Sequence, residues 1–290
     1  MTALAPSVPL WRPALWMTGA IASFTAMAVA GRAVSFQLDT FEIMLYRSLT
    51  GIFIVLVVGG WAGTLGQVTT RRAWLQVLRN MAHFTGQNLW FYALTQLALA
   101  QVFALEFTTP VWVILLSPLL LGERLTGVKL IAAALGFAGI LVVAHPDMAH
   151  VSPGLIAAAT CAIGFALAGM MTRMLTRTET ITCIMLWLTG TQALFGLICA
   201  GWDGHIALPT AATLPWLLLI GCAGLLAHFC LTTALSIAPA SVVMPMDFAR
   251  LPVIAVVGAL VYGEALDPAV AAGAVLIIAG NWINIRGARR

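Results

Sequence analysis

Two acidic residues lie inside apolar runs of this sequence, where a carboxylate can bind a polar substrate or carry a proton. Glu106 interrupts "QVFALEFTTPVWVILL" at 101–116, and Asp247 lies in a second such run with Arg250 three residues later, on the same helix face. Ionised groups in hydrocarbon are costly, so they usually face a bundle interior or an aqueous cavity and are paired. Two interpretations stay open: contact with a substrate or proton, and a buried structural ion pair.

Three prolines lie close to these acids. Pro110 follows Glu106 by four residues and has no backbone N–H, so the carbonyl of Glu106 loses its helical partner. That carbonyl can accept a hydrogen bond from a ligand, from water or from Thr109. Pro245 and Pro252 flank the second acidic site, and we expect all three prolines to kink their helices.

A third set of polar residues follows one stripe of a predicted helix. His83, Gln87 and Trp90 recur at i, i+4 and i+7, with Asn88 and Tyr92 close by. Polar and aromatic groups in this combination suit a site that stacks a planar organic ligand and orients it by a few hydrogen bonds. The alternative is packing between helices through side-chain hydrogen bonds.

Two further basic side chains fall inside predicted helices. Arg47 can pair with Glu106 or attract an anionic group, and His228 can relay protons, although a single histidine is more often a satisfied structural donor. The tripeptide "AHF" occurs at 82–84 and again at 227–229. The two histidines can therefore lie on related helix faces, or the match is due to chance.

The composition places these residues in a membrane protein. Of 290 residues, 61% are hydrophobic and 8% are charged, and the mean hydropathy is +1.01. A helix needs roughly 20 apolar residues to cross a bilayer, and an open sheet would leave backbone groups unsatisfied in lipid. We predict an all-α integral membrane protein with ten transmembrane helices, near residues 14–33, 41–60, 75–96, 98–121, 127–144, 153–174, 180–200, 212–235, 239–262 and 268–285.

The basic residues predict how the chain is oriented. With the N-terminus inside, the cytoplasmic ends hold eleven Lys and Arg residues and the outer loops hold only Arg32. Short cytoplasmic loops collect Lys and Arg, so we predict that both termini are cytoplasmic. The eleven residues are Arg12, Arg71, Arg72, Arg79, Arg124, Lys129, Arg173, Arg177, Arg286, Arg289 and Arg290.

The chain contains an internal repeat with an offset of 141 residues. Between 93–139 and 234–280, twelve of 47 positions are identical, "GERL" at 122–125 matches "GEAL" at 263–266, and Glu106 matches Asp247. Five helices per half is an odd number, so the second half enters the membrane inverted, which is a common plan of secondary transporters. We predict two five-helix repeats, 1–146 and 147–290, with small residues such as Ala132 and Gly136 allowing close helix packing.

Several function classes are disfavoured. The sequence has no GxxxxGK[ST], HExxH or GxSxG motif and no Cys/His cluster with metal spacing. We therefore expect no cofactor and no metal. We also expect no enzymatic activity, because Glu106 with His83 is the only candidate acid–base pair that could act on a substrate bond. The net charge of +4 is spread among predicted loops, so we expect no nucleic-acid partner.

The segments "LLLGERLT" at 119–126 and "DFARLPVIAVVGALVYGE" at 247–264, together with the two five-helix halves, resemble the EamA-type drug/metabolite transporter superfamily. Its members are described as exporters or uptake carriers, and relatives carry amino acids, S-adenosylmethionine or riboflavin. The resemblance implies a central cavity between the halves, lined by helices one, three, four, six, eight and nine.

The sequence therefore leads to a functional hypothesis. We expect a multi-pass protein of the bacterial inner membrane that moves a small organic metabolite, an amino acid or a related planar compound, by alternating access. A proton is a candidate coupling ion. A channel or scaffold and an intramembrane enzyme are the alternative classes.

Overall fold

The computed structural model describes residues 11–121, 126–144, 152–238, 243, 246–265 and 267–287, and these residues form helices and loops without strands. The first half contains α1 (Trp11–Val34), α2 (Thr40–Trp61), the 3-10 turn η1 (Leu65–Gln67), α3 (Ala73–Gln96), α4 (Leu99–Glu106), α5 (Thr109–Leu121) and α6 (Gly127–Ala144). The second half contains α7 (Pro153–Leu175), α8 (Ile181–Ala200), α9 (Leu214–Ile237), the 3-10 turn η2 (Asp247–Ala249), α11 (Arg250–Tyr262) and α12 (Pro268–Gly287).

The repeat offset seen in the sequence recurs in the helix boundaries. Moved by 141 positions, the bounds of α3 fall on those of α9, and the bounds of α5 fall on those of α11. The helix starts are related too, because Asp39 caps α2 and Thr180, 141 positions later, caps α8. The helices that have a described counterpart in the other half therefore follow one another in the same order.

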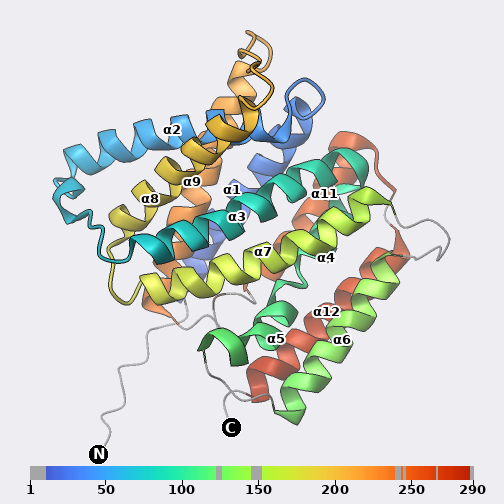
Figure 1. Cartoon of the computed structure of the whole chain (residues 1–290). Coiled ribbons are helices and arrows are strands. Elements are labelled where there is room, and N and C mark those ends of the chain that lie inside the picture. The colour runs from blue at the N-terminus through green and yellow to red at the C-terminus, as the bar shows by residue number, and fades with distance from the viewer. Residues whose placement is uncertain are drawn as a thin grey trace, which may run out of the picture.

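The helices pack in a pattern that is unchanged when the two halves are exchanged. Helix α1 packs on α9, and its repeat counterpart α7 packs on α3, the counterpart of α9. Each of the contacts α2 with α8 and α6 with α12 joins two repeat-related helices. Figure 1 shows α6 and α12 side by side, next to α5. This exchange symmetry is the packing expected of two similar halves that face each other.

The fourth and ninth predicted helices are both broken, at equivalent positions. The first break lies at residues 107–108, between α4 and α5, and the second is η2, which includes the matching residues 248–249. Pro110 lies just after the first break, in the first turn of α5. Pro252 lies in the first turn of α11 rather than at a bend, and the break precedes it. Pro245 lies outside the described residues.

Within the described residues, six helices are long and apolar enough to cross a membrane: α1, α2, α7, α8, α9 and the stretch Leu99–Leu116. Three shorter apolar helices, Gly127–Gly139, Arg250–Tyr262 and Pro268–Gly280, lie within three of the four remaining predicted spans, and the count of ten crossings stays a prediction. The fourth remaining span corresponds to α3. Helix α3 has the required length, but it carries Arg79, Asn80, His83, Gln87 and Asn88. It packs between other helices, so these polar side chains are buried.

Two hydrogen bonds each join residues that the charge bias places on the same side of the membrane. Tyr46 donates its hydroxyl to the carbonyl of Ala207 at 2.8 Å, and both residues belong to ends predicted to lie outside. Thr69 donates to Glu179 at 2.7 Å, and both belong to ends predicted to be cytoplasmic. Which group faces the cytoplasm stays a prediction. Arg79, counted among the cytoplasmic residues, is buried inside α3.

Small residues bring α6 and α12 into close contact, as predicted for Ala132. A Cβ atom added at Gly280 would lie 2.6 Å from the carbonyl oxygen of Ala132. A Cβ added at Gly139 would lie 2.6 Å from the carbonyl oxygen of Gly273. These pairs are related by the repeat offset, so the two helices use the same contact twice.

Candidate substrate site

A cluster of three charged residues, here called the acidic cluster, forms where the two broken helices meet. Its members are Glu106, Asp247 and Arg250, together with Trp90, which bonds Glu106. Nη2 of Arg250 lies 2.7 Å from Oε1 of Glu106 and 2.8 Å from Oδ2 of Asp247. Trp90 donates its indole N–H to Oε2 of Glu106 at 2.8 Å. The ion pair predicted from the spacing of Asp247 and Arg250 is thus confirmed, and it also includes Glu106. With all three groups ionised, the cluster carries one net negative charge.

Aromatic rings surround the guanidinium of Arg250. Its central carbon lies 4.8 Å from the ring centroids of Phe24 and Phe103 and 5.3 Å from that of Phe107. Cation–π attraction strengthens when the cation is desolvated, and the Arg250 side chain is only 3% exposed. The rings and the two acids therefore fix this cation in the protein interior.

The backbone acceptor freed by Pro110 is occupied by a neighbouring hydroxyl. Thr109 donates from Oγ1 to the carbonyl of Glu106 at 2.6 Å. Of the three partners considered for this carbonyl, the structure therefore shows Thr109. The break in the helix positions Glu106 at the last residue of α4, next to the cation of the opposite half.

A second cluster, here called the basic cluster, joins α2, α3, α8 and α9. Its members are His83, His228, Gln192 and Arg47. The two imidazole rings meet edge to face with centroids 4.7 Å apart, and Nδ1 of His83 accepts a hydrogen bond from the amide of Gln192. The oxygen of that amide accepts from Nη1 of Arg47 at 3.2 Å. The repeated "AHF" tripeptides therefore bring their histidines into contact.

Phe24 of α1 connects the two clusters. Its ring lies edge to face against His228, with centroids 5.6 Å apart, and it also contacts the guanidinium of Arg250. Gln87 lies on the same stripe of α3 as His83 and Trp90, which belong to the basic cluster and the acidic cluster respectively. The interior thus carries an acidic end and a basic end, joined by aromatic and amide side chains.

Several buried polar atoms of these clusters have no hydrogen-bond partner among the described residues. Most buried polar groups in proteins are satisfied, so orphaned atoms grouped in one region indicate an interior that binds water or ligand. They are Arg47 Nε, Gln87 Oε1, His228 Nε2, Asp247 Oδ1 and Arg250 Nε.

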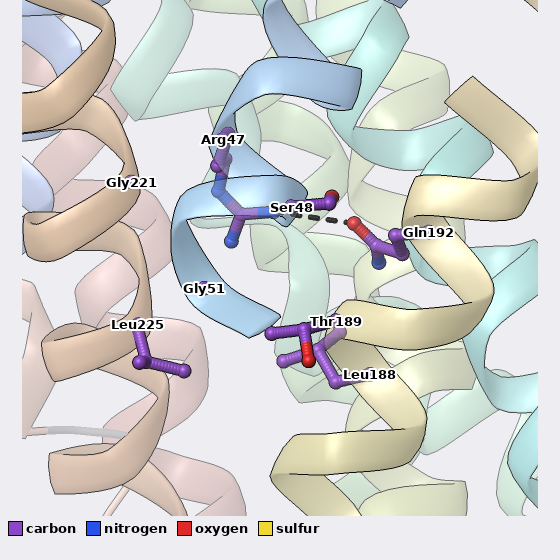
Figure 2. Close-up of a pocket in the computed structure, with 8 residues that line it drawn as sticks. All are labelled: Arg47, Ser48, Gly51, Leu188, Thr189, Gln192, Gly221 and Leu225. Carbon is purple, nitrogen blue, oxygen red and sulfur yellow. Dashed lines mark hydrogen bonds between the residues drawn. The ribbon is translucent and has the colours of Figure 1, made fainter. Parts of the chain in front are cut away.

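A hollow opens beside Arg47, between α2, α8 and α9. Figure 2 shows its lining residues, with a dashed line from Arg47 to Gln192. The volume inside it open to the centre of a water-sized sphere is about 10 Å³, which is room for about one water molecule rather than for a whole organic ligand. The lining residues are Arg47, Ser48, Gly51, Leu188, Thr189, Gln192, Gly221 and Leu225.

The three residues of the predicted stripe on α3 all face the interior, whereas Tyr92, named as a neighbour of the stripe, does not. His83, Gln87 and Trp90 are 4%, 2% and 2% exposed, whereas Tyr92 is 39% exposed. Tyr92 therefore does not join the buried clusters. Asn88 is buried, but its amide donates to the carbonyl of Phe84 on its own helix at 2.8 Å.

Of the two alternatives considered for Arg47, the structure does not show the pairing with Glu106. The carboxylate of Glu106 is held by Arg250 and Trp90, whereas Arg47 donates to Gln192. The reason is the repeat itself, because the cation that pairs with Glu106 comes from the ninth helix of the opposite half.

Two residues of the clusters were missed by the sequence analysis. Gln192 is the single amide side chain of the largely apolar helix α8, a signal that would have pointed to it. Phe24 is one of many aromatic residues in apolar helices, and nothing in its local sequence distinguishes it.

Arg32 joins the two halves at one end of the molecule. Its Nε donates to the carbonyl of Leu94 at 3.0 Å, and its guanidinium pairs with Glu264. Glu264 also accepts the backbone N–H of Leu99 at 2.9 Å. This contact ties the end of α1 and the start of α4 to the loop that follows α11.

Arg173 is the repeat counterpart of Arg32 in the second half. Helices α3 and α7 run antiparallel, and Arg173 lies at the end of this pair that is opposite to Arg32. Arg173 donates from Nη1 to the carbonyl of Leu235 at 2.7 Å, and Leu235 follows Leu94 by 141 positions. The acid that corresponds to Glu264 is Glu123, which lies outside the described residues. The arginine-to-carbonyl contact is therefore made once in each half.

Two similar helical halves, apolar helices and charged clusters buried between the halves define a polytopic membrane protein of the kind that handles polar solutes. The EamA-like transporter family matches residues 11–144 and 152–286. The chain belongs to this family of transporters.

Individual relatives carry more specific names. A riboflavin transporter of Brucella anthropi is 34% identical over 219 residues, covering 73% of this chain and 76% of that protein. An S-adenosylmethionine uptake transporter of Rickettsia bellii is 22% identical over 263 residues, covering 91% of this chain and 89% of that protein. A crystal structure with 18% identity matches with a TM-score of 0.68 over 96% of this chain and 98% of that chain. That structure supports the fold alone.

Proposed function

We propose that this protein is a secondary carrier of the bacterial inner membrane, which moves a small organic metabolite by alternating access of two inverted halves. Ten membrane crossings with both termini in the cytoplasm belong to this proposal, as does the division near residue 146. The observation that carries it is the cluster of Glu106, Arg250 and Asp247 at the paired helix breaks. Discontinuous helices near the centre of inverted repeats are where such carriers bind their substrates.

Exchange symmetry supports the alternating mechanism. Each half contributes one broken helix and one acid to the cluster, so a rocking motion of the halves changes the surroundings of both acids together. The ends of the molecule carry related contacts at Arg32 and Arg173, one of which can open while the other is closed. Glu106 is a candidate proton carrier in this cycle.

The names of the relatives and the lining of the interior suggest the substrate class. Riboflavin and S-adenosylmethionine both contain a planar ring system, and amino acids are a further candidate class. His83, Phe24 and Trp90 supply rings, and Gln87 supplies an unpartnered amide oxygen. We therefore propose a planar or amphipathic metabolite as substrate, with an amino acid, S-adenosylmethionine and riboflavin as the first candidates.

Counterflow in proteoliposomes tests the carrier proposal. Unlabelled compound on one side should accelerate entry of labelled compound from the other for at least one member of a panel of amino acids, S-adenosylmethionine and flavins. A channel gives no acceleration, and an enzyme changes the compound. Absence of exchange across the whole panel would contradict the proposal.

The variant Glu106→Gln tests the role of the acidic cluster in transport. The amide cannot hold a proton or provide a negative charge, so we expect slower exchange and a flatter dependence of the rate on pH. Glu179→Gln is the matched control, because Glu179 lies in a loop and pairs with Thr69. Wild-type rates and pH profile in correctly inserted Glu106→Gln would reduce Glu106 to a structural residue.

A further inference from the structure

The interior contains a buried arginine, Arg47, that pairs with no carboxylate among the residues that the structure describes. Arg47 is 5% exposed and lies seven residues after the start of α2, about 10 Å along the helix at 1.5 Å per residue. Arginine stays protonated in proteins. Among the described residues no carboxylate pairs with Arg47, in contrast to Arg250, which contacts two.

A second buried arginine shows how a structural cation is satisfied in this protein. Arg79 donates to Oδ1 of Asn80 at 2.7 Å and to Oγ1 of Thr172 at 2.9 Å. Arg47 instead makes a single hydrogen bond of 3.2 Å to Gln192, and its Nε is buried without a partner in the described structure. Arg47 therefore keeps donors that the protein itself does not use.

The surroundings hold the guanidinium of Arg47 at the hollow. A Cβ atom added at Gly224 would lie 2.6 Å from Nε of Arg47, so the guanidinium lies directly against the backbone of α9. Figure 2 shows the terminal nitrogen that does not bond Gln192 pointing away from that residue. The hydroxyls of Ser48 and Thr189, which also line the hollow, bond carbonyls of their own helices.

We propose that the hollow beside Arg47 is a subsite for one anionic group of the transported molecule, a carboxylate or a phosphate monoester. The fork of a guanidinium matches two oxygens of either group. The hollow has room for about one water molecule, so it admits one oxygen atom of such a group and no larger part of the metabolite. The identity of the molecule as cargo rests on the proposed carrier function, whereas anion binding by Arg47 does not.

The acidic cluster complements this subsite. It carries a net negative charge and an unpartnered oxygen, Oδ1 of Asp247, and Phe24 lies between it and the basic cluster. A molecule that spans both clusters would present its anionic group to Arg47, its planar part to the rings and a neutral or cationic donor to Asp247. This arrangement places the two ends of the substrate in two different parts of the interior, one at the basic cluster and one at the acidic cluster.

Matched probes that differ in one anionic group test the subsite. We would measure the thermal stabilisation of the purified full-length protein by riboflavin mononucleotide against riboflavin, and by tryptophan against tryptophanamide. At least one anionic member should stabilise the protein more than its neutral partner. The pair that shows the difference distinguishes a phosphate from a carboxylate.

Two variants assign the preference to Arg47. Arg47→Gln should weaken binding of the preferred anionic probe about tenfold or more, the effect of losing a charge-assisted hydrogen bond, and leave the neutral probe unchanged. Arg79→Gln, the matched control, should keep the ratio between the two probes. Gln192→Glu is the second variant, since it supplies Arg47 with a protein carboxylate. It should raise the thermal stability of the free protein and remove the anion preference.

The outcomes separate the subsite from the carrier function. Equal stabilisation by both members of each pair, or an anion preference that survives Gln192→Glu, would overturn the subsite. Counterflow of riboflavin without any anion preference would retain the carrier and remove the subsite. Anion preference without counterflow would retain the subsite and contradict the carrier.

Discussion

The fourth and ninth helices are repeat counterparts, yet only one of them supplies a cation. Each is broken next to an acid, and three residues after the acid the first half has Thr109 where the second has Arg250. Thr109 bonds the carbonyl of Glu106, whereas Arg250 bonds the carboxylates of both acids. A pseudo-symmetric pair of acids therefore shares one asymmetric cation.

This difference shows what holds the two halves together at the centre. Two buried carboxylates facing each other would repel, and an arginine in each half would leave no unbalanced charge. One arginine compensates one acid and leaves a single negative charge for a proton or a cationic substrate group. The stability of the contact between Glu106 and Asp247 thus depends more on the second half, which supplies Arg250, than on the first.

Removing the cation should have the largest effect. Arg250→Ala leaves two acids buried without a partner, so we expect the free energy of unfolding to fall by about 3–5 kcal/mol. Thr109→Val, the change at the counterpart position, removes a neutral hydrogen bond and should lower it by about 1 kcal/mol. Reversible unfolding in detergent micelles measures both.

A rescue variant separates charge from packing in this comparison. Glu106→Gln and Asp247→Asn added to Arg250→Ala remove the unpaired charges, so much of the lost stability should return. Equal losses for Arg250→Ala and Thr109→Val, or no recovery in the triple variant, would contradict the assigned role of Arg250.

The repeat, the helices and the central acids were predictable from the sequence because each leaves a periodic or local signal. The offset of 141 residues pairs Glu106 with Asp247 from the sequence alone. The spacing of Asp247 and Arg250 indicated an ion pair, which the structure contains. The partner of Glu106 was not predictable in this way. Its choice between Arg47 and Arg250 depends on how the halves meet, which is a property of the packed molecule.

The breaks were partly predictable, and the lining of the interior less so. Pro110 indicated the first break, because a proline removes a specific backbone hydrogen bond. Stripe periodicity placed Gln87 inside, where it is buried. Tyr92, named only as a neighbour of the stripe, is exposed, because the boundary of the buried face depends on the neighbouring helices. Phe24 joins the site through contacts with distant segments, which leave no local pattern.

The contact between α6 and α12 should depend equally on the two halves, unlike the cluster of Glu106, Arg250 and Asp247. Gly139→Ala and Gly280→Ala each force a methyl group against a backbone oxygen of the facing helix. We expect each variant to lower the free energy of unfolding by about 1–3 kcal/mol, by similar amounts. Gly127→Ala is the control, since no atom lies within 4 Å of its added Cβ. A large effect at only one of the two positions would show that the halves pack differently here.

The smallest expected effects distinguish the two ends of the molecule. Glu264→Gln weakens the pair with Arg32 and the bond to the Leu99 amide, and a partly exposed pair of this kind contributes about 0–1 kcal/mol. Hydrogen exchange at the start of α4 should become faster, because opening of that end no longer breaks an ion pair. Arg173→Ala should accelerate exchange at the end of α9 instead, since it removes the bond to Leu235. If either variant accelerated exchange equally at both ends, the two contacts would not act as separate closures, and the alternating motion would need a different origin.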